Sequence, residues 1–310
     1  MKSVSLLLVP AFLALIFFSC KKERSAAPGS PKLYKVTFRA SSSFSQTVNN
    51  TGGKQQVNAL AVSSDTVPIS GYSSVFRANI VNSSNVTIRQ YLQNLNKDSN
   101  FGTIVDSLPA GTYTVIMAAG QGGMYMTPRG AQQIVYYQPQ PPAAPFGVWN
   151  DTFVKTFQIT VTNGPVNQQV VLARVNAKLE VDFKDVIPAN ASRVTMNLNQ
   201  DDFQYQAQAG TPVTPDTITY SFPVPASAIG TNTFSISHLG LNTATPFTVI
   251  LTAYNSSNAV IATHTVTNVT FHANQRTILT GNFSNQATAS NPGFSITVDP
   301  NWGTPSVVHY

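Results

Sequence analysis

Few residues of this chain have the type and spacing that catalysis or metal binding requires. Its histidines are few and scattered: His238, His264, His272 and His309. Two of them could meet across adjacent strands, but two histidines without a third ligand make a poor zinc site. The stretch GQGG (120–123) lacks the lysine and the helix start of a phosphate-binding loop. Asp201 and Asp202 are consecutive and would face opposite ways on a strand, so we interpret them as a turn. We predict no enzyme activity, no metal site and no cofactor.

Cys20 is the residue with the clearest chemical role, and it is the only cysteine among 310 residues. It follows Lys2, the apolar run LLLVPAFLALIFF and the small residue Ser19, a layout typical of a secretory signal. The run is shorter than the roughly 20 residues of a spanning helix. A small residue before cysteine after an apolar run resembles the lipobox of bacterial lipoproteins. That resemblance implies removal of residues 1–19 and acylation of Cys20; the alternative is a chance cysteine in an ordinary signal peptide.

Residues 20–31 are expected to form a solvated tether, because KKERSAAPGSP is first charged and then rich in Ser, Ala, Pro and Gly. Acyl chains on Cys20 would hold the protein at a membrane, since each buried CH₂ contributes about 0.8 kcal/mol. CKKE partly resembles the signal that directs Bacteroidetes lipoproteins to the cell surface, although Arg24 stands where a second acid is expected. We therefore predict a lipid anchor in the outer membrane and exposure at the cell surface.

The composition indicates an extracytoplasmic β-protein. Charged residues make up only 10% of the chain, and neutral polar residues take their place. The formal net charge is +6, but no cluster of Lys and Arg interleaved with aromatic residues occurs, so a nucleic-acid partner is disfavoured. Because no cysteine follows Cys20, the fold has no disulfide and depends on its hydrophobic core.

Alternation of apolar and polar residues recurs along the chain and predicts β-strands. The alternating segments are 32–40, 74–81, 112–119, 153–162, 170–183, 193–199, 217–222, 233–237, 247–254, 260–266, 276–283 and 294–298. Turn clusters such as VNSSN and YNSSNA separate them. The run 86–95 is ambiguous between a short helix and a strand, and we predict a strand. Many short strands with such turns favour all-β sandwiches.

The length after residue 19 suggests about two domains. The Pro-rich stretch 138–151 is either an interdomain linker or a long loop inside the first domain. Because strand 153–162 would be needed to complete the first sheet, we place the boundary in NGPVNQ, 163–168. The predicted organisation has four parts: a signal peptide (1–19), a tether (20–31), an N-terminal sandwich (32–163) and a C-terminal sandwich (164–310).

Three stretches, LPAGTYTVIMAAG, VVLARVNAKLEVDF and NQRTILTGNFSN, resemble the fimbrillin-like lipoproteins of Bacteroidetes, which build type V pili. The strongest match is the pattern L-x-R-x-x-A-K-L-E-V, formed by Leu172, Arg174, Ala177, Lys178, Leu179, Glu180 and Val181. The resemblance implies two tandem transthyretin-like β-sandwich domains, an N-terminal lipid, and a role as a fimbrial anchor or minor subunit in assembly and adhesion. Other fimbrial subunits would then bind by strand addition, in which an extended segment pairs with an exposed sheet edge.

The resemblance also implies sites of modification. Arg-specific proteolysis removes the first strand in stalk subunits of such pili, which makes Arg39 a candidate cleavage point. We prefer an uncut strand with Arg39 facing solvent, because anchor-type members keep their N-terminus. Three short segments, DTV, DSL and DTI, match the pattern at which exported Bacteroidetes proteins are O-glycosylated, so Thr66, Ser107 and Thr217 are candidate glycosylation sites.

A surface glycan-binding lipoprotein of a polysaccharide-uptake system is the alternative function. Trp149 and Trp302 lie in Pro- or Gly-flanked sequence, where an exposed indole could stack on a sugar ring. The commoner role of such a tryptophan is to cover the end of a sandwich core, and we favour that interpretation. The tail 294–310 either forms the last strand with a docked terminus, which we prefer, or donates a strand to a neighbour.

Overall fold

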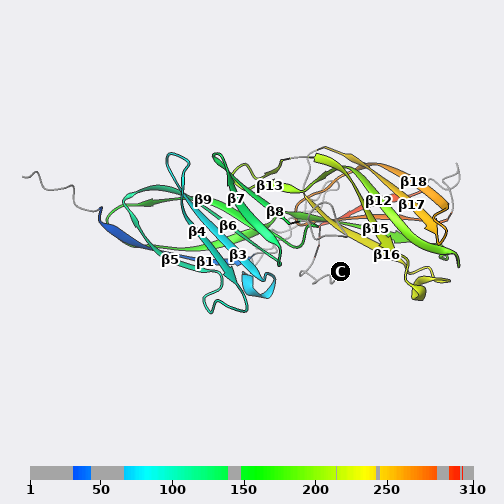
Figure 1. Cartoon of the computed structure of the whole chain (residues 1–310), viewed down its shortest axis with the longest axis horizontal. Coiled ribbons are helices and arrows are strands. Elements are labelled where there is room, and N and C mark those ends of the chain that lie inside the picture. The colour runs from blue at the N-terminus through cyan, green and yellow to red at the C-terminus, as the bar shows by residue number, and fades with distance from the viewer. Residues whose placement is uncertain are drawn as a thin grey trace, which may run out of the picture. The chain divides into compact units, whose positions relative to one another are not determined.

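The computed structural model describes residues 31–42, 66–138, 148–213, 215–241, 245–284, 293–300 and 302. The chain from Leu33 onward forms one compact unit. Within the described residues the regular structure is β-strand, apart from two short 3₁₀ turns at Ile69–Gly71 and Ala226–Ala228 (Figure 1). The predicted all-β sandwich fold is therefore confirmed.

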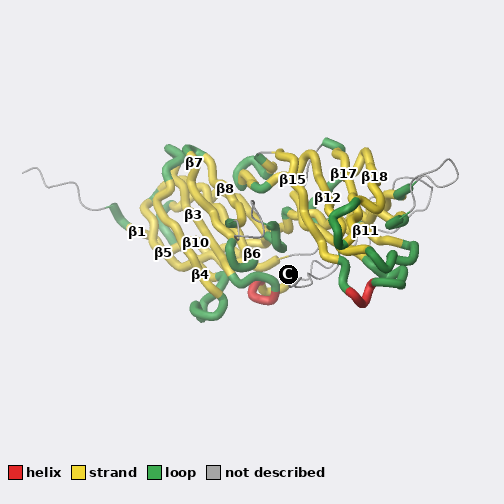
Figure 2. The backbone as a smooth tube through the Cα atoms, turned by 45° about the vertical axis from the view of Figure 1, so that its right-hand side comes forward, coloured by secondary structure: helices red, strands yellow, loops and turns green. Residues whose placement is uncertain are grey.

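The first sandwich consists of one sheet in the order β2-β1-β10-β9-β6-β3-β4, with β5 paired to β1. Its strands are β1 (Leu33–Ser42), β2 (Val67–Pro68), β3 (Val75–Asn82), β4 (Thr87–Asn94), β5 (Thr103–Pro109), β6 (Gly111–Gly120), β9 (Phe153–Val161) and β10 (Val166–Arg174). The ambiguous run 86–95 is thus a strand, as predicted. Figure 2 shows the strands side by side.

Strand β10 lets this sheet fold into two layers. Its residues 166–172 pair with β1, whereas its last two residues, Ala173 and Arg174, pair with β9. Alternate residues of both layers then point inward, as the period of a strand requires. The enclosed core is apolar and includes Val36, Phe38, Ile104, Leu108, Val170 and Leu172 from one layer and Phe76, Ala78, Ile80, Val115, Met117 and Phe153 from the other.

Side chains close the open side of the first sandwich, where β4 and β5 are the edge strands. Arg89 on β4 forms an ion pair with Asp106 on β5, with Nε and Oδ2 3.1 Å apart. The hydroxyl of Tyr91 donates to the same carboxylate oxygen. Gln93 donates from Nε2 to the carbonyl oxygen of Thr103 at 2.9 Å. These contacts join β4 to β5, so that side chains cover a side of the sandwich that would otherwise be open to solvent.

The second sandwich packs two four-stranded sheets, β16-β11-β19-β20 and β15-β12-β17-β18. Its strands are β11 (Asn176–Phe183), β12 (Ala191–Asp202), β15 (Pro215–Pro223), β16 (Ser235–Leu241), β17 (Phe247–Asn255), β18 (Val260–Val269), β19 (Arg276–Gly281) and β20 (Ser295–Asp299). Phe183 lies at the centre of an aromatic cluster in its core, stacked on Phe234 with ring centroids 5.6 Å apart and edge-on to Phe283 at 5.2 Å.

A small third sheet, in the order β14-β13-β8-β7, connects the two sandwiches. Its strands are β7 (Met124–Arg129), β8 (Gln132–Tyr137), β13 (Gln204–Gln206) and β14 (Thr211–Pro212). The first two follow β6 of the first sandwich, and the other two follow β12 of the second. A separate apolar cluster lies beneath it, formed by residues such as Ile116, Met126, Trp149, Ala207 and Leu241. We call this region the junction.

The same turn closes one hairpin in each sandwich, because both contain the letters NSSN. Asn82 Oδ1 accepts from the backbone N–H of Ser84 and Val86, and Asn85 has φ 59°. In the second sandwich Asn255 Oδ1 accepts from Ser257 and Ala259 in the same way. Asparagine suits both positions, since its side chain bonds to nearby backbone and it tolerates positive φ.

The chain passes from the first sandwich to the second at Val175. The segment 170–183, predicted as one strand, is two strands, because β10 ends at Arg174 and β11 begins at Asn176. Strand β10 follows the predicted boundary at 163/164 but pairs with β1 and β9. The division into 32–163 and 164–310 stays a prediction, and these pairings favour a boundary after β10.

Candidate functional site

The edge strands of the second sandwich differ in their protection against pairing with another chain. Strand β15 begins with Pro215, ends with Pro223 and carries Asp216. Among the strands that the structure describes, β18 pairs only with β17, and its sequence VIATHTVTNV contains no Lys, Arg, Asp, Glu or Pro. Edge strands expose unpaired backbone groups, and proteins usually protect them with charges or prolines. Strand β18 is therefore an unprotected edge.

An open groove lies between β18 and β20, the edge strands of the two sheets on that side. It is a cavity of about 400 Å³ lined by Thr263, His264, Thr265, Val266, Thr267, Gly293, Phe294 and Ile296. Ile296 lies opposite Leu279 on β19 and Val298 lies opposite Thr277, so these side chains share the inward face of the sheet. Ile296 is nevertheless 38% exposed and Val298 40%, whereas Leu279 is fully buried. The groove thus exposes part of Ile296 beside a lining rich in threonine, and the described residues leave this surface uncovered.

His264 belongs to the wall of this groove. It is buried, and its Nε2 lies 3.2 Å from the carbonyl oxygen of Phe283. Its ring is edge-on to Phe294 with centroids 5.2 Å apart. Asp185 fixes the chain near this point by accepting bonds from the backbone N–H groups of Phe283 and Ser284. Burial alone raises the pKa of Asp185, but these bonds and the Ser284 hydroxyl outweigh it and lower that pKa.

The opposite side of the second sandwich is closed by a buried polar cluster. Asp201 Oδ2 accepts from the hydroxyl of Tyr220 at 2.7 Å and lies 2.9 Å from Nε2 of His238. Asp201 and His238 are almost completely buried. The prediction of a turn at Asp201 and Asp202 is wrong: both lie in β12, after a register shift between Leu198 and Asp201. Such a bulge lets two consecutive residues both be buried.

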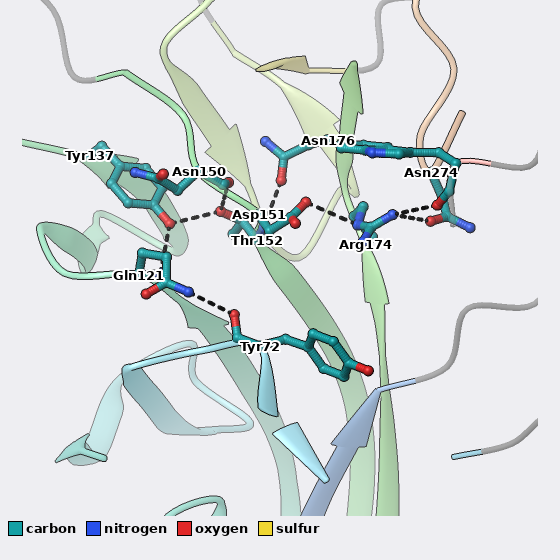
Figure 3. Close-up of polar contacts among 10 residues, drawn as sticks. Tyr72, Gln121, Tyr137, Asn150, Asp151, Thr152, Arg174, Asn176 and Asn274 are labelled. Carbon is teal, nitrogen blue, oxygen red and sulfur yellow. Dashed lines mark hydrogen bonds and ion pairs between the residues drawn. The ribbon is translucent and has the colours of Figure 1, made fainter. Parts of the chain in front are cut away.

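A second polar network fixes the junction (Figure 3). Arg174 at the end of β10 forms an ion pair with Asp151, with Nε and Oδ1 3.1 Å apart. The arginine side chain is fully buried and that of Asp151 is 9% exposed. Arg174 also donates from Nη1 to Asn274 Oδ1 at 2.8 Å and to the carbonyl oxygen of Trp302 at 3.2 Å. One side chain therefore joins three segments that are far apart in the sequence.

Aromatic rings cover the guanidinium of Arg174. Its central carbon lies 4.1 Å from the centre of the Trp302 ring and 5.6 Å from that of Phe153. Burial lowers the pKa of Arg174, and the charge of Asp151 opposes that effect. Burial likewise raises the pKa of Asp151, and Arg174 opposes the rise. Because the site has a low dielectric constant, each of the two charges would be strongly destabilising without the other.

Neighbouring side chains complete this network. Asn176 Oδ1 accepts from the backbone N–H of Thr152 at 2.7 Å, and the hydroxyls of Thr152 and Tyr137 lie 3.0 Å apart. Burial raises the pKa of Tyr137, so its hydroxyl stays protonated. Gly120 allows this ring to approach, because a Cβ there would lie 2.4 Å from the Tyr137 oxygen. Trp149 is 1% exposed and donates from Nε1 to the carbonyl oxygen of Asp202 at 2.9 Å.

The structure separates the predicted modification sites. Cys20 lies outside the described residues. Arg39 is exposed on β1, but its backbone lies between Thr103 of β5 and Gln169 of β10. Cleavage there would require β1 to leave both neighbours first. Thr66 and Thr217 are exposed, whereas Ser107 is partly buried on β5. Cleavage and glycosylation stay predictions.

In the sequence, the pattern around Arg174 and the tryptophan at Trp149 were the two features that fall in the junction. Lys178 and Glu180 of the same pattern form an ion pair on β11, which Arg276 on β19 and Asp299 on β20 extend. Sequence reasoning missed Asp151, Asn176 and the cluster around Asp201, because their partners lie far along the chain. Within the described residues, no group of three or more His, Cys, Asp or Glu residues is placed to hold a metal ion. None of the described helices has the length and apolar character needed to cross a membrane.

These features define an all-β protein of two β-sandwiches joined through a third small sheet, with an open groove at one sandwich edge. The chain belongs to DUF6562, a family of unknown function, whose sequence profile matches residues 149–309, just over half of the chain. A search among curated proteins found no match.

Solved structures from Bacteroidetes share this fold at low sequence identity. The fimbrial anchor protein Mfa2 from Porphyromonas gingivalis aligns with a TM-score of 0.53 and 9% identity, over 86% of this chain and 97% of that one. A candidate polysaccharide-binding protein from Bacteroides thetaiotaomicron aligns with a TM-score of 0.54 and 7% identity, over 86% and 96%. A candidate adhesin from Bacteroides ovatus gives 0.50 and 9%, over 75% and 77%. The resemblance to fimbrillin-like proteins is thus confirmed at the level of the fold.

Proposed function

We propose that this protein is a lipid-anchored outer-membrane protein that acts as a fimbrial anchor or minor fimbrial subunit in pilus assembly and cell adhesion. Other fimbrial subunits bind it by strand addition. Cys20 carries the lipid, and the protein has no enzymatic role. The fold shared with a fimbrial anchor protein and a candidate adhesin supports this proposal.

The groove between β18 and β20 is the observation that carries the strand-addition proposal. An added strand needs free backbone groups for hydrogen bonding and apolar surface for its alternate side chains. The unprotected edge of β18 supplies the first, and the partly exposed Ile296 in the groove, with Val298 beyond it on β20, supplies the second. The partner that fits is an extended segment with aliphatic side chains at every second position.

The glycan-binding alternative has less support. It requires exposed aromatic rings, but Trp149 is 1% exposed and Trp302 lies against Arg174. The candidate polysaccharide-binding protein supports it only through a shared fold. We therefore keep adhesion through protein partners as the proposed function.

Replacing Cys20 by serine is expected to abolish incorporation of labelled palmitate and to move the protein from the membrane to the soluble fraction, because serine has no thiol to acylate. The measurement is fatty-acid labelling with fractionation of cells that express the full chain. Ser19→Ala is the matched control, since it keeps a small residue before the cysteine and should leave labelling intact. Membrane retention of Cys20→Ser would contradict the anchor.

The Ile296→Asp variant is expected to lose attached fimbriae, because a charge in the groove opposes an apolar strand. Fimbriae on intact cells are counted by electron microscopy, and surface labelling verifies the amount of lipoprotein. Val186→Asp is the matched control, since it adds the same charge at a valine that is 60% exposed and outside the groove. Normal fimbriation of Ile296→Asp, or equal loss in both variants, would refute the assignment of the groove.

A further inference from the structure

Strand β1 has partners on both sides over most of its length. Its residues 36–42 pair in parallel with residues 166–172 of β10, at seven positions. On its other side, residues 33–39 pair antiparallel with residues 103–109 of β5, also at seven positions. Val36 and Phe38 are completely buried in the core of the first sandwich. The two pairings place β1 between β5 and β10.

The parallel pairing sets the direction in which tension crosses the first sandwich. The chain enters β1 at Leu33, and residue Val36 lies beside Val166 at the start of β10. Strand β10 ends at Arg174, and after one residue the chain continues as β11 of the second sandwich. A pull on the residues before β1, opposed by a pull on the second sandwich, therefore acts on opposite ends of the β1–β10 pair.

Such a load runs along the strands and shears the evenly spaced, slanted hydrogen bonds of this parallel pair. All seven paired positions then resist together, whereas a load on the same end of both strands breaks them one after another. Withdrawal of β1 also extracts Val36 and Phe38 from the core in the same step. The ion pair between Arg89 and Asp106 holds β5, the other neighbour of β1, against β4.

We propose that the β1–β10 pair is a mechanical clamp that carries tension between the N-terminal attachment and a partner bound to the second sandwich. This inference rests on the proposed function, which supplies both points of attachment. The junction completes the load path, because Arg174 at the end of β10 is fixed to Asp151 and Asn274 before the chain enters β11. Forced unfolding is a rate process, so the geometry of loading decides the rupture force.

Single-molecule pulling in two directions tests the clamp on the non-acylated chain from Cys20 onward. Cys20 is the only native cysteine and serves as one handle. Ser257→Cys, in the exposed β17–β18 turn, gives loading along the strands. Gly164→Cys, just before β10, gives loading at one end, and nothing lies within 4 Å of its added Cβ. We expect a severalfold higher rupture force with the Ser257 handle; equal forces overturn the clamp.

Two matched variants test whether the β1–β10 pair is the part of the protein that resists the pull. Val36→Ala on β1 and Val115→Ala on β6 remove the same atoms from fully buried positions of one core. Both should lower the denaturation midpoint similarly, but only Val36→Ala should lower the rupture force with the Ser257 handle. An equal drop in force overturns the clamp. The outcome is independent of Cys20 acylation and of fimbriation, so the clamp and the proposed function can fail separately.

Discussion

Replacing Arg174 by alanine is expected to lower the free energy of unfolding by about 3–5 kcal/mol, the usual cost of removing one partner of a buried ion pair. Asp151 would stay behind with its side chain 9% exposed and without its counter-charge. Burial already raises the pKa of that carboxyl, and Arg174 is the main influence that opposes the rise. Urea or guanidinium denaturation followed by circular dichroism measures the change.

The other contacts of Arg174 add to this loss. Its guanidinium donates to Asn274 and to the backbone of Trp302, so these acceptors lose a charged donor. The stacking of Trp302 over the guanidinium also disappears. Asn274 and Trp302 lie in the last part of the chain. The variant should therefore weaken both the junction and the attachment of β10 to that part.

Two controls separate the buried charge from arginine in general. Arg193→Ala removes an arginine that lies 3.8 Å over the Tyr254 ring and bonds to Asn258 near the surface, and should cost about 1 kcal/mol or less. The double variant Arg174→Met, Asp151→Leu should recover much of the loss, since replacing both partners by apolar residues is often neutral. A loss for Arg174→Ala no larger than for Arg193→Ala would contradict the role of the ion pair.

Strands with one buried face could be predicted from the sequence, because burial of every second side chain makes apolar and polar residues alternate. The segment 247–254 differs from β17 by one residue, and burial in β17 alternates from Phe247 to Tyr254. Several short strands were not predicted. In β8, three consecutive residues, Gln133, Ile134 and Val135, are buried, so no alternation marks the strand. Strand β5 was missed too, because it alternates only weakly.

No turn residue in the sequence marks the point where the chain passes from one sandwich to the other. The alternation in VVLARVNAKLEVDF continues across Val175 without a turn residue, although the chain changes sandwich there. Burial changes phase there, from even positions in β10 to odd positions in β11, but the apolar residues at odd positions from 171 to 183 hide this change in the sequence. The boundary was predicted in NGPVNQ because turn residues cluster there.

The polar clusters were unpredictable for a different reason. Arg174 meets Asn274 and Trp302, which are 100 and 128 positions away, and Asp201 meets His238 after 37. Such pairs are chosen by the tertiary fold, and a single sequence has no local signal for them. The family pattern singled out Arg174 together with Lys178 and Glu180, but the structure was needed to show that the arginine is buried and the other two form an ion pair near the surface.

Replacing Trp149 by alanine is expected to lower the free energy of unfolding by about 3–5 kcal/mol, the usual range for removing a buried large aromatic side chain. The indole is 1% exposed and lies edge-on to Tyr137 with ring centroids 5.4 Å apart. It belongs to the apolar cluster that joins residues of both sandwiches. The resulting cavity would therefore lie in the junction, and denaturation should report it directly.

The Trp149→Phe variant separates the loss of apolar contact from the loss of the indole hydrogen bond. Phenylalanine keeps most of the apolar contact but cannot donate to the carbonyl oxygen of Asp202, so about 1–3 kcal/mol should be lost through that unsatisfied group. Trp302→Ala is the matched control: this half-buried ring covers Arg174, and its removal should cost less than Trp149→Ala. If Trp149→Ala kept full stability and instead abolished binding to a polysaccharide panel, Trp149 would be a ligand-binding residue and the glycan-binding function would replace the one proposed.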